Sequence, residues 1–293
     1  YTYSQSAASA VAYQDLTAIA QTKAENAVDV FVYDTSKDSD GGAWRKRTQH
    51  TSWYNETLNT SNRGSRKEFP AVAVIVAESN KVTIYDGDDP SLPMWMVYST
   101  SIMTSCYALN GVMYVGRTSS LREMNFLKDT HAYYATSGKA FDNNPVALAK
   151  ISNSWGALDA SWAIVNGSIN DVAMTVLPDA PIDQATGLPI PTIAVATDGG
   201  VSVIKDDGTV VDITHWGGSG YSYTEYVEFL DDYVVFTQDS SSQRDLMKFK
   251  IPDQDTTINQ NSAPVVTTSD GRAQAIKVNN IISNLSVSKV SPS

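Results

Sequence analysis

The chain has a single cysteine, Cys106, among its 293 residues. One thiol cannot form an intrachain disulfide, and a cysteine-based zinc site needs several thiols. The stretch around it, SCYALNG, lies in an apolar run. Cysteine in such surroundings behaves as a small hydrophobe rather than a nucleophile. We therefore expect Cys106 to be buried and unreactive.

Positive charge and long apolar runs are also scarce. The net charge is −11, which disfavours nonspecific binding to nucleic acid or to an anionic membrane. No apolar run approaches the roughly 18 residues of a spanning helix, so no membrane insertion is expected. The opening residues, YTYSQSAASA, lack a Met and a signal-peptide pattern. We expect the numbering to begin inside a longer protein or after processing.

Known catalytic and metal-binding motifs are absent from the sequence. H-E-x-x-H, G-x-S-x-G and phosphate-binding glycine motifs do not occur. A calcium loop counted from Ser36 would start on a serine and end on Arg47 instead of a glutamate, so the Asp-rich segments are better explained as turns. We predict no enzyme activity, no catalytic residue, no cofactor and no metal. A glycosidase that uses acids such as Asp231 and Asp232 is the less favoured alternative. The three histidines are widely separated: His50, His131 and His215.

The first 27 residues differ in composition from the rest. Residues 4–27 are rich in Ala and Gln and contain no Gly or Pro. Val11, Leu16 and Ile19 fall roughly at helical spacing, which predicts a short helix. Its apolar stripe is thin, so we expect residues 1–27 to be a connector that docks on the body or on another chain.

Residues 28–69 combine a strand, VDVFVYD, with a basic loop. Between Arg45 and Lys67 the loop holds six basic side chains against the single acid Glu56. A solvated loop is one explanation of this concentration, and a contact surface for an acidic partner such as another copy is the second. A nucleic-acid patch is the least favoured, because the rest of the chain is acidic. The candidate subunit-interface residues are Arg45, Lys46, Arg47, Arg63, Arg66 and Lys67.

An internal repeat fills the rest of the chain. PAVAVIVAESNKVTIYDGDD, from Pro70, aligns with PTIAVATDGGVSVIKDDG, from Pro191, so that Val76 matches Val195, 119 residues later. Leu109-Asn110-Gly111 matches Leu230-Asp231-Asp232 at an offset of 121. We divide this part into unit 1 at 70–190 and unit 2 at 191–293, which includes the start of a third unit. That third echo lies near Asn284, so we expect the natural chain to continue.

Each unit contains roughly eight candidate strands separated by tight turns. Eight short strands fit two four-stranded antiparallel sheets. In a β-propeller such sheets pack face to face, which explains runs as apolar as residues 71–77. We predict an all-β propeller, incomplete in this chain, with a short N-terminal helix. Tandem β-sandwiches are the alternative, and a solenoid would need a shorter period.

A Gly-Ser loop rich in aromatics is the candidate recognition site. THWGGSGYSYTEY lies between predicted strands. Tyr and Trp in such loops offer a flat apolar face and a polar tip, which suits contact with a sugar or a protein. The alternative is that these rings fill the core between sheets. The candidate residues are His215, Trp216, Tyr221 and Tyr223.

The stretches DVFVYDTSKDSDGGAWRKRTQHTSWYNETLN, RGSRKEFPAVAVIVAE and LPIPTIAVATDGGVSVIKDDGTVVDIT resemble virion structural proteins of marine tailed bacteriophages, including cyanophage-like viruses. The resemblance covers residues 28–252 and carries no catalytic or binding motif. It implies a tail, fibre or appendage component in the virion, assembled in several copies with other virion proteins.

Three functions follow as expectations. The first is a virion structural protein that acts by assembly and surface recognition. The second is a carbohydrate-binding propeller that serves as the host adhesin and contacts a host glycan or protein. The third, least favoured, is a polysaccharide-degrading tail enzyme.

Overall fold

The structure is a computed structural model of the chain. It describes residues 27–99, 102–144, 148, 154–215, 223–240, 243–258 and 273–276. Residues 1–26, which carry the predicted helix, and the third echo near Asn284 lie outside these ranges, whereas Ala27 belongs to a strand. Within them the helical segments are three short 3-10 turns: η2 (Thr35–Lys37), η3 (Ala43–Arg47) and η4 (Ala160–Trp162).

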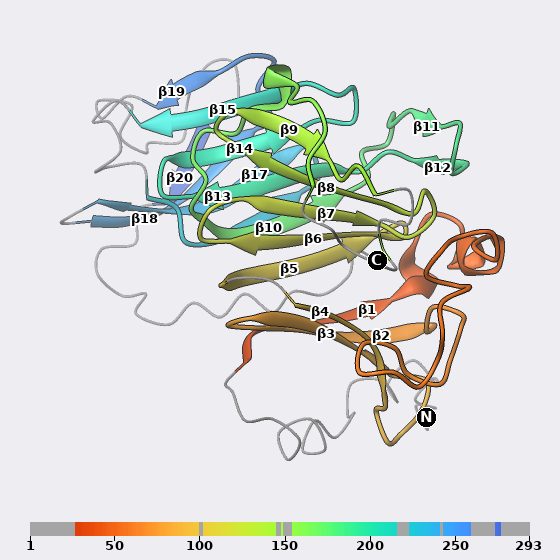
Figure 1. The fold of residues 1–293 in the computed structure, drawn as a ribbon. Coiled ribbons are helices and arrows are strands. Elements are labelled where there is room, and N and C mark those ends of the chain that lie inside the picture. Colours follow the sequence, from red (N-terminus) through yellow and green to blue (C-terminus); the bar gives the residue numbers. More distant parts are fainter. Residues whose placement is uncertain are drawn as a thin grey trace, which may run out of the picture.

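Four small sheets, or blades, build the molecule (Figure 1). The first contains β1 (Ala27–Asp34), β2 (Val72–Glu78), β3 (Lys81–Asp86) and β4 (Met94–Ser99). The second contains β5 (Met103–Leu109), β6 (Val112–Arg117), β7 (Leu121–Asn125), β8 (Thr130–Ala135) and β9 (Gly138–Phe141). The third contains β10 (Ile169–Thr175), β13 (Thr192–Thr197), β14 (Gly200–Ile204), β15 (Val210–His215) and the parallel β19 (Thr256–Ile258). The fourth contains β16 (Val227–Leu230), β17 (Tyr233–Ser240), β18 (Gln243–Lys250) and β20 (Ala273–Ile276).

The blades are arranged as a four-bladed propeller, which confirms the predicted fold class. Their first strands contact one another in series, β1 with β5, β5 with β10, and β10 with β16. One apolar core joins the first three blades and a second joins the third to the fourth. Cys106 lies fully buried on β5, as expected.

The register of the strands confirms the internal repeat. Val76 pairs with Thr83 across the β2–β3 hairpin, and Val195 pairs with Ser202 across β13–β14. The two pairs are separated by the 119 residues found in the sequence. The strands before these hairpins also correspond, because β1 pairs with β2 as β10 pairs with β13. The unit boundary at Pro191 therefore falls inside the third blade.

The long β1–β2 connection forms part of the core. Trp44, Trp53 and Phe69 are completely buried, although they lie in the segment that carries the basic residues. The ring of Trp53 packs edge-on against Trp95 of β4, with centroids 5.4 Å apart. Its Nε1 donates to the carbonyl of Phe126 at 2.9 Å. The aromatic side chains of this segment therefore fill the space between the first and second blades.

Candidate functional site

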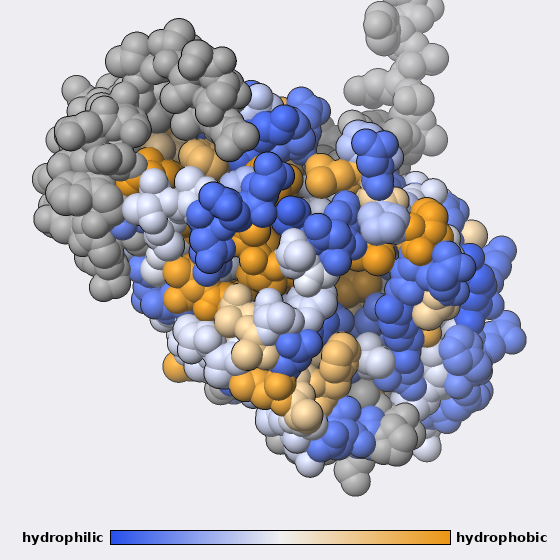
Figure 2. Space-filling view, turned by 90° about the horizontal axis from the view of Figure 1, so that it is seen from above, coloured by the Kyte–Doolittle hydropathy of each residue, from blue (hydrophilic) through white to orange (hydrophobic). Residues whose placement is uncertain are grey.

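A pocket of about 320 Å³ opens between the second and third blades. The second blade contributes β6, β7, β8 and β9, and the third contributes β13 and β14. A further wall is the segment that contains the short hairpin of β11 (Ile182–Asp183) and β12 (Leu188–Pro189). In the space-filling view from above, apolar side chains are interleaved with polar ones on the described part of the face shown (Figure 2).

The deep part of the pocket is a buried polar cluster centred on Glu123. Its Oε2 accepts hydrogen bonds from the hydroxyls of Tyr114 and Tyr134 at 2.7 and 2.8 Å. Lys139 Nζ donates to the same oxygen at 2.9 Å and to the Tyr134 hydroxyl at 2.6 Å. All three donors converge on one oxygen. Among the described residues, Oε1 of Glu123 makes no hydrogen bond.

Cross-strand pairing explains how these four side chains meet. Glu123 of β7 is paired with Tyr114 of β6, and Tyr134 of β8 is paired with Lys139 of β9. Side chains of directly paired residues lie on the same face of a sheet, within contact distance. The cluster is thus set by the register of the second blade.

Burial and charge determine the protonation of this cluster. Burial alone would raise the pKa of Glu123, but Lys139 and the hydrogen bonds of Lys139 and the two tyrosines lower it below its usual value. Burial, together with the Glu123 carboxylate, holds the pKa of Tyr114 and of Tyr134 well above the ordinary tyrosine value. The pocket therefore contains an anionic carboxylate held by neutral hydroxyls and an ammonium group.

Aromatic rings surround the ammonium group. Lys139 Nζ lies 4.6 Å from the centroid of Tyr134 and 4.9 Å from that of Trp162. Both distances are typical of cation–π contacts. Trp162 packs beside Gly208 in the wall of the pocket, where a Cβ at Gly208 would lie 3.4 Å from its ring. Trp162 is half-buried and lines the pocket.

The mouth of the pocket carries mixed charge. Lys128 forms an ion pair with Asp183, which joins the second blade to the β11–β12 hairpin. Burial, and then the neighbouring Asp207, raises the pKa of Asp206. The mouth therefore has no strong excess of either sign.

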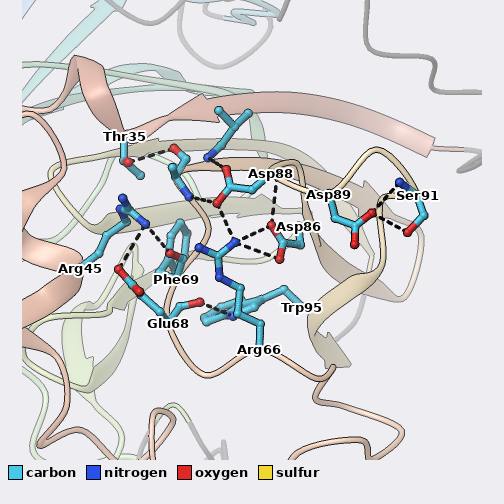
Figure 3. A network of polar contacts seen from close by, with 12 residues as sticks. Thr35, Arg45, Arg66, Glu68, Phe69, Asp86, Asp88, Asp89, Ser91 and Trp95 are labelled. Atoms are coloured by element: carbon cyan, nitrogen blue, oxygen red, sulfur yellow. Dashed lines mark hydrogen bonds and ion pairs between the residues drawn. The ribbon is translucent and has the colours of Figure 1, made fainter.

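The predicted basic surface is largely paired within its own chain. Arg63 is completely buried, with its guanidinium 4.5 Å from the Trp95 ring centroid and 3.4 Å from Glu56. Arg66 bridges Asp86 and Asp88, at 2.9 and 2.6 Å (Figure 3). Asp88 in turn accepts the backbone amides of residues 71 and 72, so this network fastens the loop to β2.

The other four candidate interface residues are distributed along the same segment. Arg45 donates to the carbonyl of Phe69 at 2.9 Å (Figure 3), and Arg47 lies 3.0 Å from Asp40. Lys67 stands over the Tyr54 ring at 5.7 Å, and Lys46 is exposed. Most of the loop's charge is thus balanced by local partners. Its role as a subunit interface stays a prediction.

The aromatic loop is only partly described. His215 ends β15 in a half-buried position, and Tyr223 is 36% exposed. Trp216 and Tyr221 lie outside the described residues. Neither His215 nor Tyr223 lines the pocket.

Sequence reasoning missed the pocket residues. Glu123, Tyr134 and Lys139 line the pocket, and none of them is among the residues predicted from the sequence. A usable signal was present, because Glu123 is an acidic residue at a buried position of its strand and therefore requires a polar partner. Among the described residues there is no group of three or more potential metal ligands.

Comparisons with known proteins give only distant similarities. No family model and no curated protein matches the chain. Hsv2 from Kluyvelomyces marxianus matches with 11% identity and a TM-score of 0.33, over 63% of this chain and 48% of that one. The extracellular domain of the two-component system BT4673 from B. thetaiotaomicron matches with 12% identity and a TM-score of 0.32, over 71% of this chain and 27% of that one. The chain spans about half or less of these two proteins. No helix of the described part is long and apolar enough to cross a membrane.

Proposed function

We propose that this chain is a structural component of a tailed-phage particle that acts by assembly and by recognising a carbohydrate, without turnover. The phage role rests on the resemblance of residues 28–252 to virion proteins. The recognition role rests on one observation, the preformed pocket between the second and third blades.

The chemistry of the pocket favours a sugar. Its volume of about 320 Å³ is at the lower end of the roughly 300–1,000 Å³ of small-molecule sites. Glu123 Oε1 offers a hydrogen-bond acceptor, and Asn125 offers an amide nitrogen without a hydrogen bond among the described residues. Trp162 supplies an apolar ring face. A sugar presents hydroxyls that both donate and accept, together with an apolar ring face.

The same geometry favours binding over hydrolysis. A glycosidase needs two opposed carboxyl groups, one of which has a raised pKa so that it can act as an acid. The pKa of Glu123 is lowered and its Oε2 is already engaged by three donors. Asp206 has a raised pKa, but it lies at the mouth beside Asp207. Hydrolysis therefore requires an acid that the deep cluster does not supply.

The test is binding of the purified chain to an array of bacterial surface glycans, followed by calorimetry on the best ligand. We expect Trp162→Ala to abolish binding and Tyr223→Ala, an exposed tyrosine outside the pocket, to leave it unchanged. If Tyr223→Ala lost binding and Trp162→Ala kept it, the glycan would be recognised by the aromatic loop and not by the pocket. Release of reducing sugar from a bound glycan would show that the chain is a glycosidase and not only a binding protein. An array without any binding signal would overturn the carbohydrate role. Mass spectrometry of purified particles tests the virion role separately.

A further inference from the structure

The first blade has one face that no other described blade covers. Along β1, Phe31 and Tyr33 point into the core, whereas the alternate residues point away from it. These alternate residues are Val28, Val30 and Val32, which are 50, 38 and 36% exposed. A row of three exposed valines on one strand is unusual for a surface that only water contacts.

The repeat identifies what such a face is built for. Val30 pairs with Val76 as Val172 of the third blade pairs with Val195, so Val30 and Val172 are equivalent. By the same register Val32 is equivalent to Met174. Val172 and Met174 are 0 and 1% exposed, because this face of the third blade packs on the second blade. Val30 and Val32, the central part of the valine row, are therefore equivalent to residues of a buried blade-to-blade interface.

The fourth blade is the equivalent of the second. The β5–β6 turn has Asn110 in the left-handed region with φ 51°, and the β16–β17 turn has Asp231 there with φ 55°. The pairs flanking these turns, Leu109 with Val112 and Leu230 with Tyr233, are also offset by the same 121 residues. The fourth blade therefore has a face equivalent to the one with which the second blade covers the third.

That face of the fourth blade is accessible. Val234 and Phe236 point into the core toward the third blade, and the alternate residues Tyr233 and Val235 are half-buried. Leu230, paired with Tyr233, is 50% exposed. The described propeller thus ends in two different faces, each equivalent to one side of an interface that already exists inside the chain.

We propose that the fourth blade of one copy packs on the first blade of a second copy. The contact repeats between chains the packing of the second blade on the third within a chain. It joins two different surfaces, so it is a head-to-tail contact, which closes into a ring or continues as a filament. The valine row of β1 lies against Leu230, Tyr233 and Val235 of the neighbouring copy. This inference rests on the assembly part of the proposed function and is independent of the pocket.

The experiment measures molar mass by light scattering and sedimentation velocity on the full chain. We expect the unmodified chain to form dimers or larger species. Val30→Asp places a charge in the apolar face of the first blade, and Leu230→Asp places a charge in the apolar face of the fourth blade. Each variant alone is therefore expected to be monomeric. Leu158→Asp, at an exposed leucine outside both faces, is the control and assembles normally. Circular dichroism shows that each variant is folded.

Mixing the two monomeric variants is the decisive step. One intact face remains on each, so the mixture is expected to form a 1:1 dimer and nothing larger. A mixture that stays monomeric, or a Leu230→Asp variant that assembles like the unmodified chain, overturns the head-to-tail contact. A full chain that is monomeric and assembles only after removal of residues 1–26 would show that this segment covers the valines instead. Glycan binding is expected to persist in both variants, so failure of assembly and failure of recognition are distinguishable.

Discussion

Lys139 Nζ lies 2.9 Å from Glu123 Oε2, although their strands, β9 and β7, are separated in the sheet by β8. Tyr134 of β8 stands between them and is hydrogen-bonded to both. The pair is almost fully buried, with side-chain exposures of 9 and 10%. An ion pair in such a place is sensitive to the loss of either member, because the remaining charge would be largely buried without a partner of opposite sign.

Lys139→Met is therefore expected to reduce the free energy of unfolding by about 3–5 kcal/mol, since it leaves the Glu123 carboxylate buried without a cation. The double variant Glu123→Gln with Lys139→Met is expected to be more stable than Lys139→Met alone, because no unpaired charge remains. Urea unfolding of the two single variants and the double variant measures the coupling. Additive losses would mean that the two groups do not interact.

The pH dependence of stability should reveal Asp38. Burial raises the pKa of Asp38 to about 6. Hydrogen bonds that its carboxylate accepts from Tyr33, Trp44 and the amide of Asn110 lower the pKa but do not offset the burial. A raised pKa means that the folded state binds the proton more tightly than the unfolded state does. This contribution to stability is present below about pH 4 and is lost as the pH rises through about 6.

The shift corresponds to about 3 kcal/mol at most. We expect the Asp38→Asn variant to lack this decrease between pH 4 and 6.5, even if its stability at any one pH is lower. Urea midpoints measured across that range on both proteins provide the comparison. Parallel profiles would assign the effect to another group.

His131 is expected to act in the opposite direction in the same pH range. Burial, and then the nearby Arg122, lowers the pKa of His131 to about 4, despite Asp142 at 3.3 Å. A lowered pKa means that the folded state resists protonation, so its stabilising contribution is present above about pH 6.5 and is lost as the pH falls toward 4. The variant His131→Gln should remove this loss. An NMR titration in which the imidazole changes charge near pH 6.5 would contradict the prediction.

The fold could be predicted because its signals are local. Each apolar run and each Asp-Gly or Asn-Gly turn spans only a few residues. The same pattern of runs and turns recurs 119 residues later in the second copy. The register of β2–β3 and β13–β14 then followed the alignment residue by residue. Such signals survive without knowledge of tertiary contacts.

The site could not be predicted because its contacts are not local. The basic loop has an excess of positive charge only when its own residues are counted. The acids that pair with Arg66 lie outside it, 20 and 22 residues further along the chain. Glu123 and Lys139 are 16 residues apart, and Asp206 comes from another blade. Sequence spacing alone does not fix which of these groups meet.

The turn at Asp231 offers a direct test of the repeat. Asp231 has φ 55° and is exposed, and the equivalent residue Asn110 has φ 51°. In this left-handed region glycine is unstrained, whereas a β-branched residue costs about 1–3 kcal/mol. Asp231→Gly is therefore expected to leave the free energy of unfolding unchanged or raise it slightly, and Asp231→Val to lower it by about 1–2 kcal/mol. Asn110→Gly should be more costly than Asp231→Gly, because the Asn110 side chain also bonds Ser39 and the carbonyl of Pro189. Equal effects of Gly and Val at position 231, measured by urea unfolding, would show that the two turns do not share one backbone conformation.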